Sequence, residues 1–400
     1  MEYTFSDRIS TLKPSAIREI FKYAADPAVV SLSAGNPAPD AFACKQIGEV
    51  CAKIFAEHPI DALQYSVTEG YPKLRSFIRD YMLSRHGIGR DFDDVLVTSG
   101  AQQVMELSAK VLCNAGDVVI CEDPSFIGSL NCFRSIGAVL KGVPMEADGM
   151  SMEALEKVLA ETPNARFIYT IPNFQNPTGI TMSPEKRRKM YALAKQYGVL
   201  IVEDNPYGDL RYKGKDLPSI KSFDEDGLVI YSGSFSKVIA PGLRVGYCVA
   251  PQAIVKKMVV GKQGEDAHTN ILAQLICYGF LTSYDFDENL ENLRALYRKK
   301  AEYCMQLLDQ YITPHGITYH PIEGGMFIWC TLPDGVDMPS FCTRAVQEYK
   351  VAIVPGTAFL CDENGSSQCF RINFTTPSDT QLEEGIRRLA RFADDLLTKG

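Results

Sequence analysis

The chain has 400 residues, of which 46% are hydrophobic and 22% charged, and its formal net charge at pH 7 is −8. This length predicts more than one domain, and the composition is that of a packed globular protein. The negative charge argues against nucleic acid or an anionic membrane as a partner, because phosphate contacts need a basic face.

Twelve cysteines are scattered along the chain without a Cys-x-x-Cys pair, and several interrupt apolar runs such as residues 118–121. Such thiols favour a reduced, cytoplasmic protein over disulfides or zinc. The five histidines lack the spacing of metal ligands, so we expect no metal site. The first residues do not resemble a signal peptide, and no apolar run of 18 residues predicts a transmembrane helix.

Near the start, residues 14–25 read as a short amphipathic helix, and a loop rich in glycine and proline follows at 31–39. Between about 92 and 250, helical stretches such as 101–113 and 183–197 alternate with short apolar runs. Runs without polar alternation are typical of strands buried on both faces of a mainly parallel sheet. These runs are residues 95–98, 118–121, 167–171, 199–202, 228–231 and 245–249.

The texture of the sequence changes after about residue 285. A long charged helix is predicted at 286–311, short strands at 326–331 and 370–374, and a closing helix at 380–397. We therefore expect an α/β fold in which helices sandwich a mainly parallel central sheet, together with a smaller α+β domain. In such a fold the ligand binds at the carboxyl ends of the strands.

Lys237 follows the strand predicted at 228–231 and is surrounded by Ser234, Ser236 and Arg244. A lysine amine can condense with a carbonyl group and so anchor a cofactor covalently. Hydroxyl groups and an arginine beside it suit a phosphate monoester. Together these residues indicate pyridoxal 5'-phosphate held as a Schiff base, against the alternative of a surface loop with ordinary charged residues.

Other segments carry polar residues at predicted strand ends. Residues 98–103 pass from a strand end into a helix start, where free amides attract phosphate. Asn176 belongs either to a plain turn or to a contact with a ligand oxygen. Asp204 leaves a buried strand and needs a positive partner such as a pyridinium nitrogen, unless it caps a helix. Arg371, on a predicted strand, suits a substrate carboxylate or a structural ion pair.

The order and spacing of these segments resemble the fold type I aminotransferases of class I/II, which depend on pyridoxal phosphate. Within them the chain is most similar to the kynurenine/2-aminoadipate aminotransferase-like branch. The resemblance covers nearly the whole chain, from Ile17-Arg18-Glu19 to Arg371. It rests on Gln64-Tyr65-Ser66, Glu69-Gly70-Tyr71-Pro72-x-Leu74-Arg75, Ser99-Gly100-Ala101-Gln102-Gln103, Asn176-Pro177-Thr178-Gly179, Asp204-x-x-Tyr207, Ser234-x-Ser236-Lys237, Arg244 and Arg371.

This resemblance implies a role for each matching residue. Lys237 would form the Schiff base and shuttle the substrate proton, and Asp204 would pair with the pyridinium nitrogen. Asn176 and Tyr207 would hydrogen-bond the phenolic oxygen of the ring. The remaining residues expected around the cofactor are Gly100, Ala101, Gln102, Ser234, Ser236 and Arg244 at the phosphate, Phe126 on the ring face, and Tyr65 at the phosphate of the neighbouring subunit.

For the substrate, the resemblance implies that Arg371 holds the α-carboxylate with help from Asn176, near Gly35. Arg18 would either pair with a distal carboxylate or be a solvated charge. The implied domains are an N-terminal arm at 1–45 that belongs to the small domain and covers the active site, a large domain at 46–285 and a small domain at 286–400. The shared site implies a homodimer.

Two residues depart from the family pattern. Phe126 stands where many relatives have a tyrosine, and Ala101 replaces a serine, so one hydroxyl contact is lost at each position. The implied activity is transfer of an amino group from a broad range of donors, aromatic, 2-aminoadipate or large aliphatic, to a 2-oxo acid such as 2-oxoglutarate. The alternatives are a β-lyase or decarboxylase on the same fold and, less favoured by the charge, the effector domain of a transcription regulator.

Overall fold

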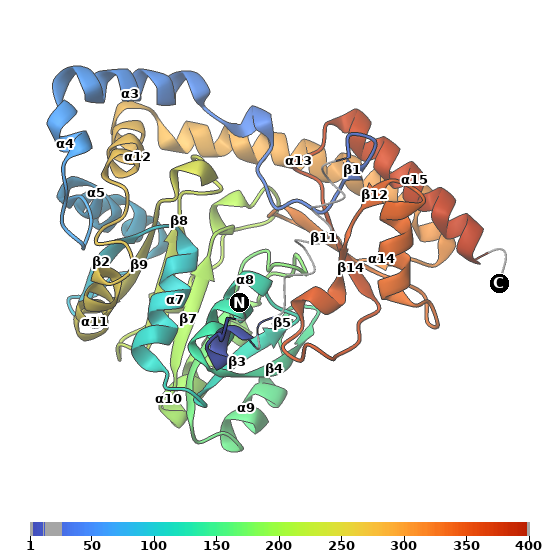
Figure 1. The fold of residues 1–400 in the computed structure, drawn as a ribbon, viewed down its shortest axis with the longest axis horizontal. Coiled ribbons are helices and arrows are strands. Elements are labelled where there is room, and N and C mark those ends of the chain that lie inside the picture. Colours follow the sequence, from blue (N-terminus) through green and yellow to red (C-terminus); the bar gives the residue numbers. More distant parts are fainter. Residues whose placement is uncertain (1–2, 11, 13–25, 398–400) are drawn as a thin grey trace.

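The computed structural model describes residues 3–10, 12 and 26–397, and these residues build a central sheet of eight strands flanked by helices (Figure 1). The strands lie side by side in the order β2-β9-β8-β7-β6-β3-β4-β5. Their bounds are β2 (Asp93–Thr98), β3 (Val118–Asp123), β4 (Val139–Glu146), β5 (Gly149–Met150), β6 (Ala165–Thr170), β7 (Leu200–Asn205), β8 (Val229–Ser234) and β9 (Gly246–Pro251).

Strands β4, β3, β6, β7 and β8 run parallel to one another, which confirms the mainly parallel sheet. Strand β9 is antiparallel to both of its neighbours, β8 and β2, and β5 is antiparallel to β4. The connection from β8 to β9 contains no crossover helix, so the chain returns in the opposite direction. The apolar composition of β9 gave no sign of this reversal, because strands buried on both faces look alike in either direction.

Helices cover both faces of this sheet. On β3, Val119 and Cys121 join an apolar cluster that also contains Phe133 of α8, whereas Val118 and Ile120 join a second cluster formed with α9 and α10. Successive side chains of a strand point to opposite faces, so this division is that of a three-layer sandwich. The covering helices are α7 (Ala101–Leu112), α8 (Ile127–Ile136), α9 (Met152–Ala160), α10 (Pro184–Tyr197) and α11 (Gln252–Gln263).

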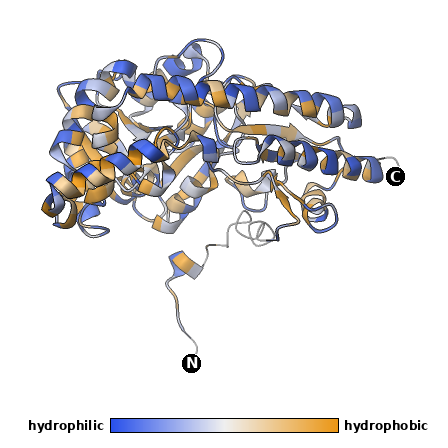
Figure 2. Ribbon diagram, turned by 90° about the horizontal axis from the view of Figure 1, so that it is seen from above, coloured by the Kyte–Doolittle hydropathy of each residue, from blue (hydrophilic) through white to orange (hydrophobic). Residues whose placement is uncertain are grey.

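A further group of helices packs around α12 near the β2 side of the sheet (Figure 1). It consists of α3 (Cys44–Glu57), α4 (Pro59–Leu63), α5 (Pro72–Phe77), the π-helical turn η2 (Ile78–Met82), α6 (Leu83–His86) and α12 (Ile271–Ser283). Colouring by hydropathy places hydrophobic residues on the central strands and hydrophilic ones on the outward faces of the helices (Figure 2). The short α1 (Asp7–Ser10) lies near α8.

The C-terminal part begins with α13 (Phe286–Tyr311), whose bounds equal the predicted ones, and the Asp285 side chain caps it by accepting a hydrogen bond from the Glu288 amide at 3.0 Å. A four-stranded antiparallel sheet follows in the described chain, in the order β10-β11-β14-β13. Its neighbours include β1, which pairs in parallel with β12. The elements are β1 (Val30–Ser31), β10 (Thr318–Tyr319), β11 (Phe327–Thr331), α14 (Met338–Gln347), β12 (Val351–Ala352), β13 (Val354–Pro355), β14 (Cys369–Asn373) and α15 (Asp379–Leu397).

Short 3₁₀ turns connect several of these elements. They are η1 (Pro39–Ala41), η3 (Gly208–Leu210), η4 (Ile220–Phe223), η5 (Pro241–Leu243), η6 (Thr313–His315) and η7 (Gly356–Phe359). The helix predicted at 14–25, with Ile17 and Arg18, lies outside the described residues. Within residues 3–10, 12 and 26–397, no helix combines the length and the apolar character needed to cross a membrane.

Candidate active site

A cavity of about 310 Å³ opens at the carboxyl edge of the sheet, where β6, β7 and β8 end and α7 begins. Most of the predicted site residues line it, although they come from distant parts of the chain. The lining residues are Gly35, Asn36, Ala101, Gln102, Met105, Phe126, Ser129, Ile171, Asn176, Asp204, Pro206, Tyr207, Ser234, Ser236, Lys237, Pro241, Arg244, Phe327 and Arg371.

Lys237 follows β8 and extends its amine into this cavity, where Nζ donates a hydrogen bond of 2.8 Å to the Gly35 carbonyl. Burial, together with the positive charges of Arg244 and Arg371, lowers the pKa of Lys237 to about 8. An amine with this pKa is neutral in part at neutral pH, and only the neutral form is a nucleophile. The lysine is therefore suited to attack a carbonyl carbon.

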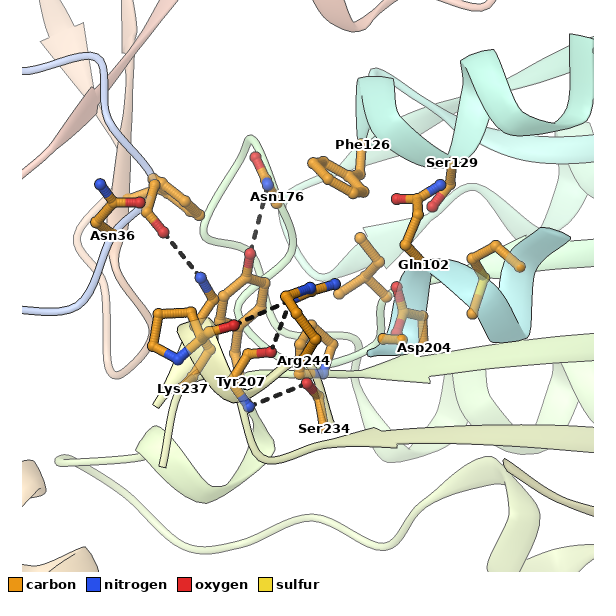
Figure 3. A pocket seen from close by; sticks show the side chains of 18 of the residues that line it. Asn36, Gln102, Phe126, Ser129, Asn176, Asp204, Tyr207, Ser234, Lys237 and Arg244 are labelled. Atoms are coloured by element: carbon orange, nitrogen blue, oxygen red, sulfur yellow. Dashed lines mark hydrogen bonds between the residues drawn. The ribbon is translucent and has the colours of Figure 1, made fainter. Parts of the chain in front are cut away.

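Asp204 lies near the end of β7, and Figure 3 shows it on the opposite side of the cavity from Lys237. Its Oδ2 accepts a hydrogen bond of 3.1 Å from Tyr169, whose hydroxyl accepts one of 2.8 Å from Ser129. Its Oδ1 is buried and has no hydrogen-bond partner among the described residues. Burial raises the pKa of Asp204 to about 6. The Ser232 hydroxyl of the neighbouring β8 lies beside Asp204 and is also unpartnered within the described chain, so Oδ1 is left free to accept from a ligand group that carries a proton.

The N-terminus of α7 forms one wall of the cavity. Gly100 precedes this helix with a φ of 80°, and no side chain of the described chain caps the first amides. A Cβ at Gly100 would overlap the guanidinium of Arg244 and displace it, and the positive φ also favours glycine. Uncapped amides at a helix start bind anions.

Arg244 adds a positive charge beside these amides. Its Nη1 lies 3.5 Å from the Ser236 hydroxyl, and its Nη2 donates to the Ser99 carbonyl at 3.3 Å. The Ser234 hydroxyl accepts a hydrogen bond of 3.2 Å from the Ser236 amide. Gln102 points into the same region and donates to the Gly128 carbonyl at 2.9 Å. These groups can hold a phosphate dianion.

Arg371 of β14 is buried and lines the same cavity. Its Nη1 donates to Asn176 Oδ1 at 2.8 Å, and its Nη2 donates to the Ser33 carbonyl at 2.8 Å. Its Nε has no partner among the described residues, and the guanidinium stacks 4.1 Å from the Phe327 ring centre. Burial lowers the pKa of Arg371 to about 10, so the group stays charged at neutral pH. It can therefore receive a carboxylate.

Asn176 also donates to the Tyr207 hydroxyl at 3.4 Å, which brings two polar groups to one side of the cavity. Burial raises the pKa of Tyr207 above its usual value, so its hydroxyl remains a donor. Gly35 contributes a main-chain wall against which the Phe327 ring packs. Tyr65 does not line the cavity: it is 84% exposed, and its ring meets His268 edge-on.

Sequence reasoning did not single out Ser129, Tyr169, Asn36 or Phe327. Ser129 and Tyr169 are fully buried and act through Asp204, and one hydroxyl in a helix or a strand has no distinguishing sequence signal. Phe327 lies in a predicted strand, where an apolar residue is indistinguishable from one that packs in the core. Arg18 lies outside the described residues, so its contact with substrate stays a prediction.

A family model described as aminotransferase class I and II matches residues 27–389. The chain belongs to this family. Aromatic-amino-acid aminotransferase 1 of Thermococcus litoralis is 36% identical, covering 100% of this chain and 96% of that protein. The 2-aminoadipate transaminase of Thermus thermophilus is 37% identical, covering 98% and 97%.

Solved structures give the same result. The alpha-aminoadipate aminotransferase LysN of Thermus thermophilus, complexed with N-(5'-phosphopyridoxyl)-L-leucine, superposes on this aminotransferase with a TM-score of 0.90 at 36% identity, covering 99% of this chain and 98% of that one. The predicted family, α/β fold and amino-group transfer are thereby confirmed, and pyridoxal 5'-phosphate is the cofactor.

The cavity itself fits this cofactor. The unpartnered Oδ1 of Asp204 matches a protonated ring nitrogen, the amine of Lys237 matches an aldehyde, and the α7 amides with Arg244 match a phosphate. An aldehyde and a ring nitrogen on opposite sides of one ring require an amine and a carboxylate on opposite sides of the cavity. Lys237 and Asp204 meet this requirement (Figure 3).

Proposed function

We propose that this aminotransferase accepts a broad range of amino donors, namely aromatic amino acids, 2-aminoadipate and large aliphatic amino acids, and passes the amino group to a 2-oxo acid such as 2-oxoglutarate. The observation that carries the chemistry is the unpartnered, buried Oδ1 of Asp204 on the side of the cavity opposite the Lys237 amine. The names of the relatives, an aromatic and a 2-aminoadipate aminotransferase, support the range of donors. So does the apolar surface given by Phe126, Ile171 and Phe327.

In this proposal, each polar residue of the cavity has one task. When bound, pyridoxal phosphate supplies an electrophilic carbon and a ring that accepts electrons from the substrate. Asp204 holds a proton at the ring nitrogen, and Asn176 and Tyr207 donate hydrogen bonds to the phenolic oxygen. Lys237 would hold the cofactor through its amine and would move the α-proton of the substrate at Nζ.

Other residues that line the cavity bind and orient the substrate and the cofactor. Arg371 grips the α-carboxylate of the substrate and so fixes which bond to the α-carbon can break. The phosphate is held by Gly100, Ala101, Gln102, Ser234, Ser236 and Arg244, and Phe126 covers one face of the ring. Asn176 and Gly35 complete the substrate side, and Arg18 remains the proposed contact for a distal carboxylate.

A β-lyase or decarboxylase would use the same Lys237 and Asp204. We therefore test the proposal by incubating the holoenzyme with each class of donor plus 2-oxoglutarate, and by measuring glutamate together with pyruvate, ammonia and carbon dioxide. Glutamate formed one-for-one with the new 2-oxo acid supports the proposal. Release of pyruvate and ammonia, or of carbon dioxide, without 2-oxoglutarate contradicts it.

We also propose that the active unit is a homodimer in which Tyr65 reaches the phosphate of the neighbouring subunit. Support comes from exposed apolar side chains on and after α4, namely Ile60, Leu63 and Val67, beside the highly exposed Tyr65. The proposed domains are 46–285 and 286–400, with an arm at 1–45 over the site. Pairing of β1 with β12 ties part of this arm to the C-terminal elements.

Hybrid dimers distinguish a shared site from a private one. Lys237→Ala and Tyr65→Ala chains are produced together with different tags, and the doubly tagged hybrid is purified. If Tyr65 acts across the interface, one site of each hybrid has both residues intact, and the hybrid regains about half of the wild-type activity at limiting cofactor. A hybrid no more active than half of the Tyr65→Ala homodimer contradicts the shared site.

We propose a cytoplasmic location as well. All twelve cysteines are free in the structure, which suits a reducing compartment.

A further inference from the structure

Glu122, near the end of β3, is a fully buried carboxylate outside the cavity. It is held in the described structure by neutral donors: the Thr170 hydroxyl at 2.5 Å, the Ile171 amide at 3.1 Å and Gln175 Nε2 at 3.1 Å. Burial raises the pKa of Glu122 to about 7. A buried carboxyl group without a cationic partner is costly, so its contacts call for a functional explanation.

Gln175, in the segment that follows β6, connects Glu122 to that segment by hydrogen bonds. Besides Glu122, its Nε2 donates to the Pro124 carbonyl at 2.8 Å. Its Oε1 accepts from both the amide and the hydroxyl of Thr178, at 2.9 and 2.7 Å. Gln175 is fully buried, and its bonds tie down both ends of the turn that contains Asn176. Glu122 and Gln175 therefore help to hold this turn in place.

The side chain fixed by this turn contacts two other site residues. Asn176 accepts from Arg371 at 2.8 Å and donates to Tyr207 at 3.4 Å. We propose that Glu122 is a positioning residue, which acts through Gln175 to hold Asn176 where it aligns Arg371 for the substrate carboxylate and Tyr207 for the phenolic oxygen of the cofactor. This inference rests on the proposed roles of Arg371, Asn176 and Tyr207.

Two substitutions separate the geometry of Glu122 from its charge. In Glu122→Gln, the amide oxygen accepts from Ile171 and Gln175 while the amide nitrogen donates to a reoriented Thr170 hydroxyl, so the whole network survives. In Glu122→Leu, these donors lose their acceptor. The matched control is Glu203→Leu. Glu203 is equally buried on β7 and accepts hydrogen bonds of 2.6 to 3.0 Å from Ser219 and from the amides of residues 220 and 221. Neither Glu203 nor these three donor residues line the cavity.

The experiment measures KM and kcat for an amino donor, and the pH midpoint of the absorbance change of the bound cofactor, in each holoenzyme. We expect Glu122→Leu to raise KM roughly tenfold or more, with a smaller change in kcat, because the carboxylate site is misaligned. We expect the midpoint to rise by about half a pH unit, because weaker donation to the phenolic oxygen stabilises the protonated imine. We expect Glu122→Gln to have the KM and the midpoint of the wild type. Glu203→Leu should lower thermal stability and leave KM and the midpoint unchanged.

Unchanged KM and midpoint in Glu122→Leu overturn the inference, as does an equal effect of Glu203→Leu. If Glu122→Leu does not fold, Gln175→Met takes its place with the same expected and contrary results. Arg371→Lys is measured alongside. If that variant leaves KM unaltered, the proposed role of Arg371 fails, whereas a raised KM there with a normal Glu122→Leu enzyme refutes only the role of Glu122.

Discussion

Arg371 donates a hydrogen bond of 2.8 Å to Asn176, although 195 positions separate the two residues in the chain. Asn176 belongs to the turn after β6, and Arg371 to a strand of the C-terminal sheet. The bond therefore joins the central sheet to the C-terminal elements at the point where a substrate carboxylate binds in the proposed mechanism. Loss of this alignment affects substrate binding before it affects the cofactor.

Arg371→Lys tests this expectation. A lysine keeps the charge but loses the planar pair of donors that matches a carboxylate, so we expect kcat/KM for donor and acceptor to fall roughly 100-fold. Steady-state kinetics with both substrates give this value. The absorbance spectrum of the bound cofactor serves as the control and remains that of the wild type. A large loss of bound cofactor would instead assign Arg371 to the cofactor site.

The depressed pKa of Lys237 predicts the pH dependence of cofactor capture. With a pKa of about 8, the amine of the cofactor-free protein is neutral in about one molecule in ten at pH 7. The rate of imine formation at a fixed cofactor concentration should rise about tenfold per pH unit below pH 8 and level off above it. Stopped-flow absorbance measures this rate. A rate that keeps rising towards pH 10 would show an unperturbed lysine, and Lys237→Ala should form no imine at all.

Asp204→Asn should lower kcat by roughly 10²- to 10³-fold, because a neutral amide no longer stabilises a protonated ring nitrogen as charge develops. Lys237 is intact in this variant, so the imine absorbance should persist. Single-turnover kinetics with a donor amino acid separate the chemical step from binding. Retention of more than a tenth of kcat would contradict the role of Asp204.

The same variant should change the stability of the cofactor-free protein. The folded chain keeps the Asp204 proton up to about pH 6, whereas the unfolded chain loses it near pH 3.8. Stability of the wild type therefore falls as the pH rises from about 4 to about 6, and it stays lower by about 3 kcal/mol above that. Asp204→Asn should remove this part of the pH dependence. Denaturant unfolding of both cofactor-free proteins at pH 4 and pH 7 gives the change in the free energy of unfolding between the two pH values. The same change in the wild type and in Asp204→Asn would refute the prediction.

Gly100 and Gly116 form a matched pair for testing the phosphate site. Both have positive φ, 80° and 86°, so alanine strains the backbone at either position by about 1 kcal/mol. A Cβ at Gly100 overlaps Arg244, whereas a Cβ at Gly116 meets nothing within 4 Å. We expect Gly100→Ala to raise the dissociation constant of the cofactor about tenfold or more and Gly116→Ala to leave it unchanged. Equal dissociation constants for the two variants would contradict the role of Arg244 in binding the phosphate.

Much of this fold could be predicted from the sequence, because buried parallel strands and capped helices leave strong local signals. The helix predicted at 286–311 has these bounds in the structure, whereas its cap, Asp285, was not predicted. Strand β4 was missed because it is only partly buried and carries Lys141 and Pro144, so no continuous apolar run marks it. The two-residue strands β1, β12 and β13 are set by pairing with distant partners and have no pattern of their own.

The candidate site divides in the same way. Lys237, Asp204 and Arg244 stand in local motifs, and the structure brings them to one cavity. Tyr169 and Ser129, which fix the orientation of Asp204, could not be predicted, since their roles depend on a chain of hydrogen bonds between separate elements. Glu122 was overlooked for the same reason: a carboxyl group at a strand end is informative only when its burial is known.

The wall that faces Lys237 is made largely of backbone. Gly35 offers a carbonyl, and its neighbours are fastened by main-chain groups: Leu32 bonds to Ala352 and Asn373, and the Asn36 carbonyl accepts from Thr375. Peptide groups are identical in every residue, so substitutions in this stretch leave in place the type of group that accepts the hydrogen bond from Lys237. Changes in substrate choice are therefore expected from the side chains that line the cavity, among which Asn36 is the one that this stretch contributes.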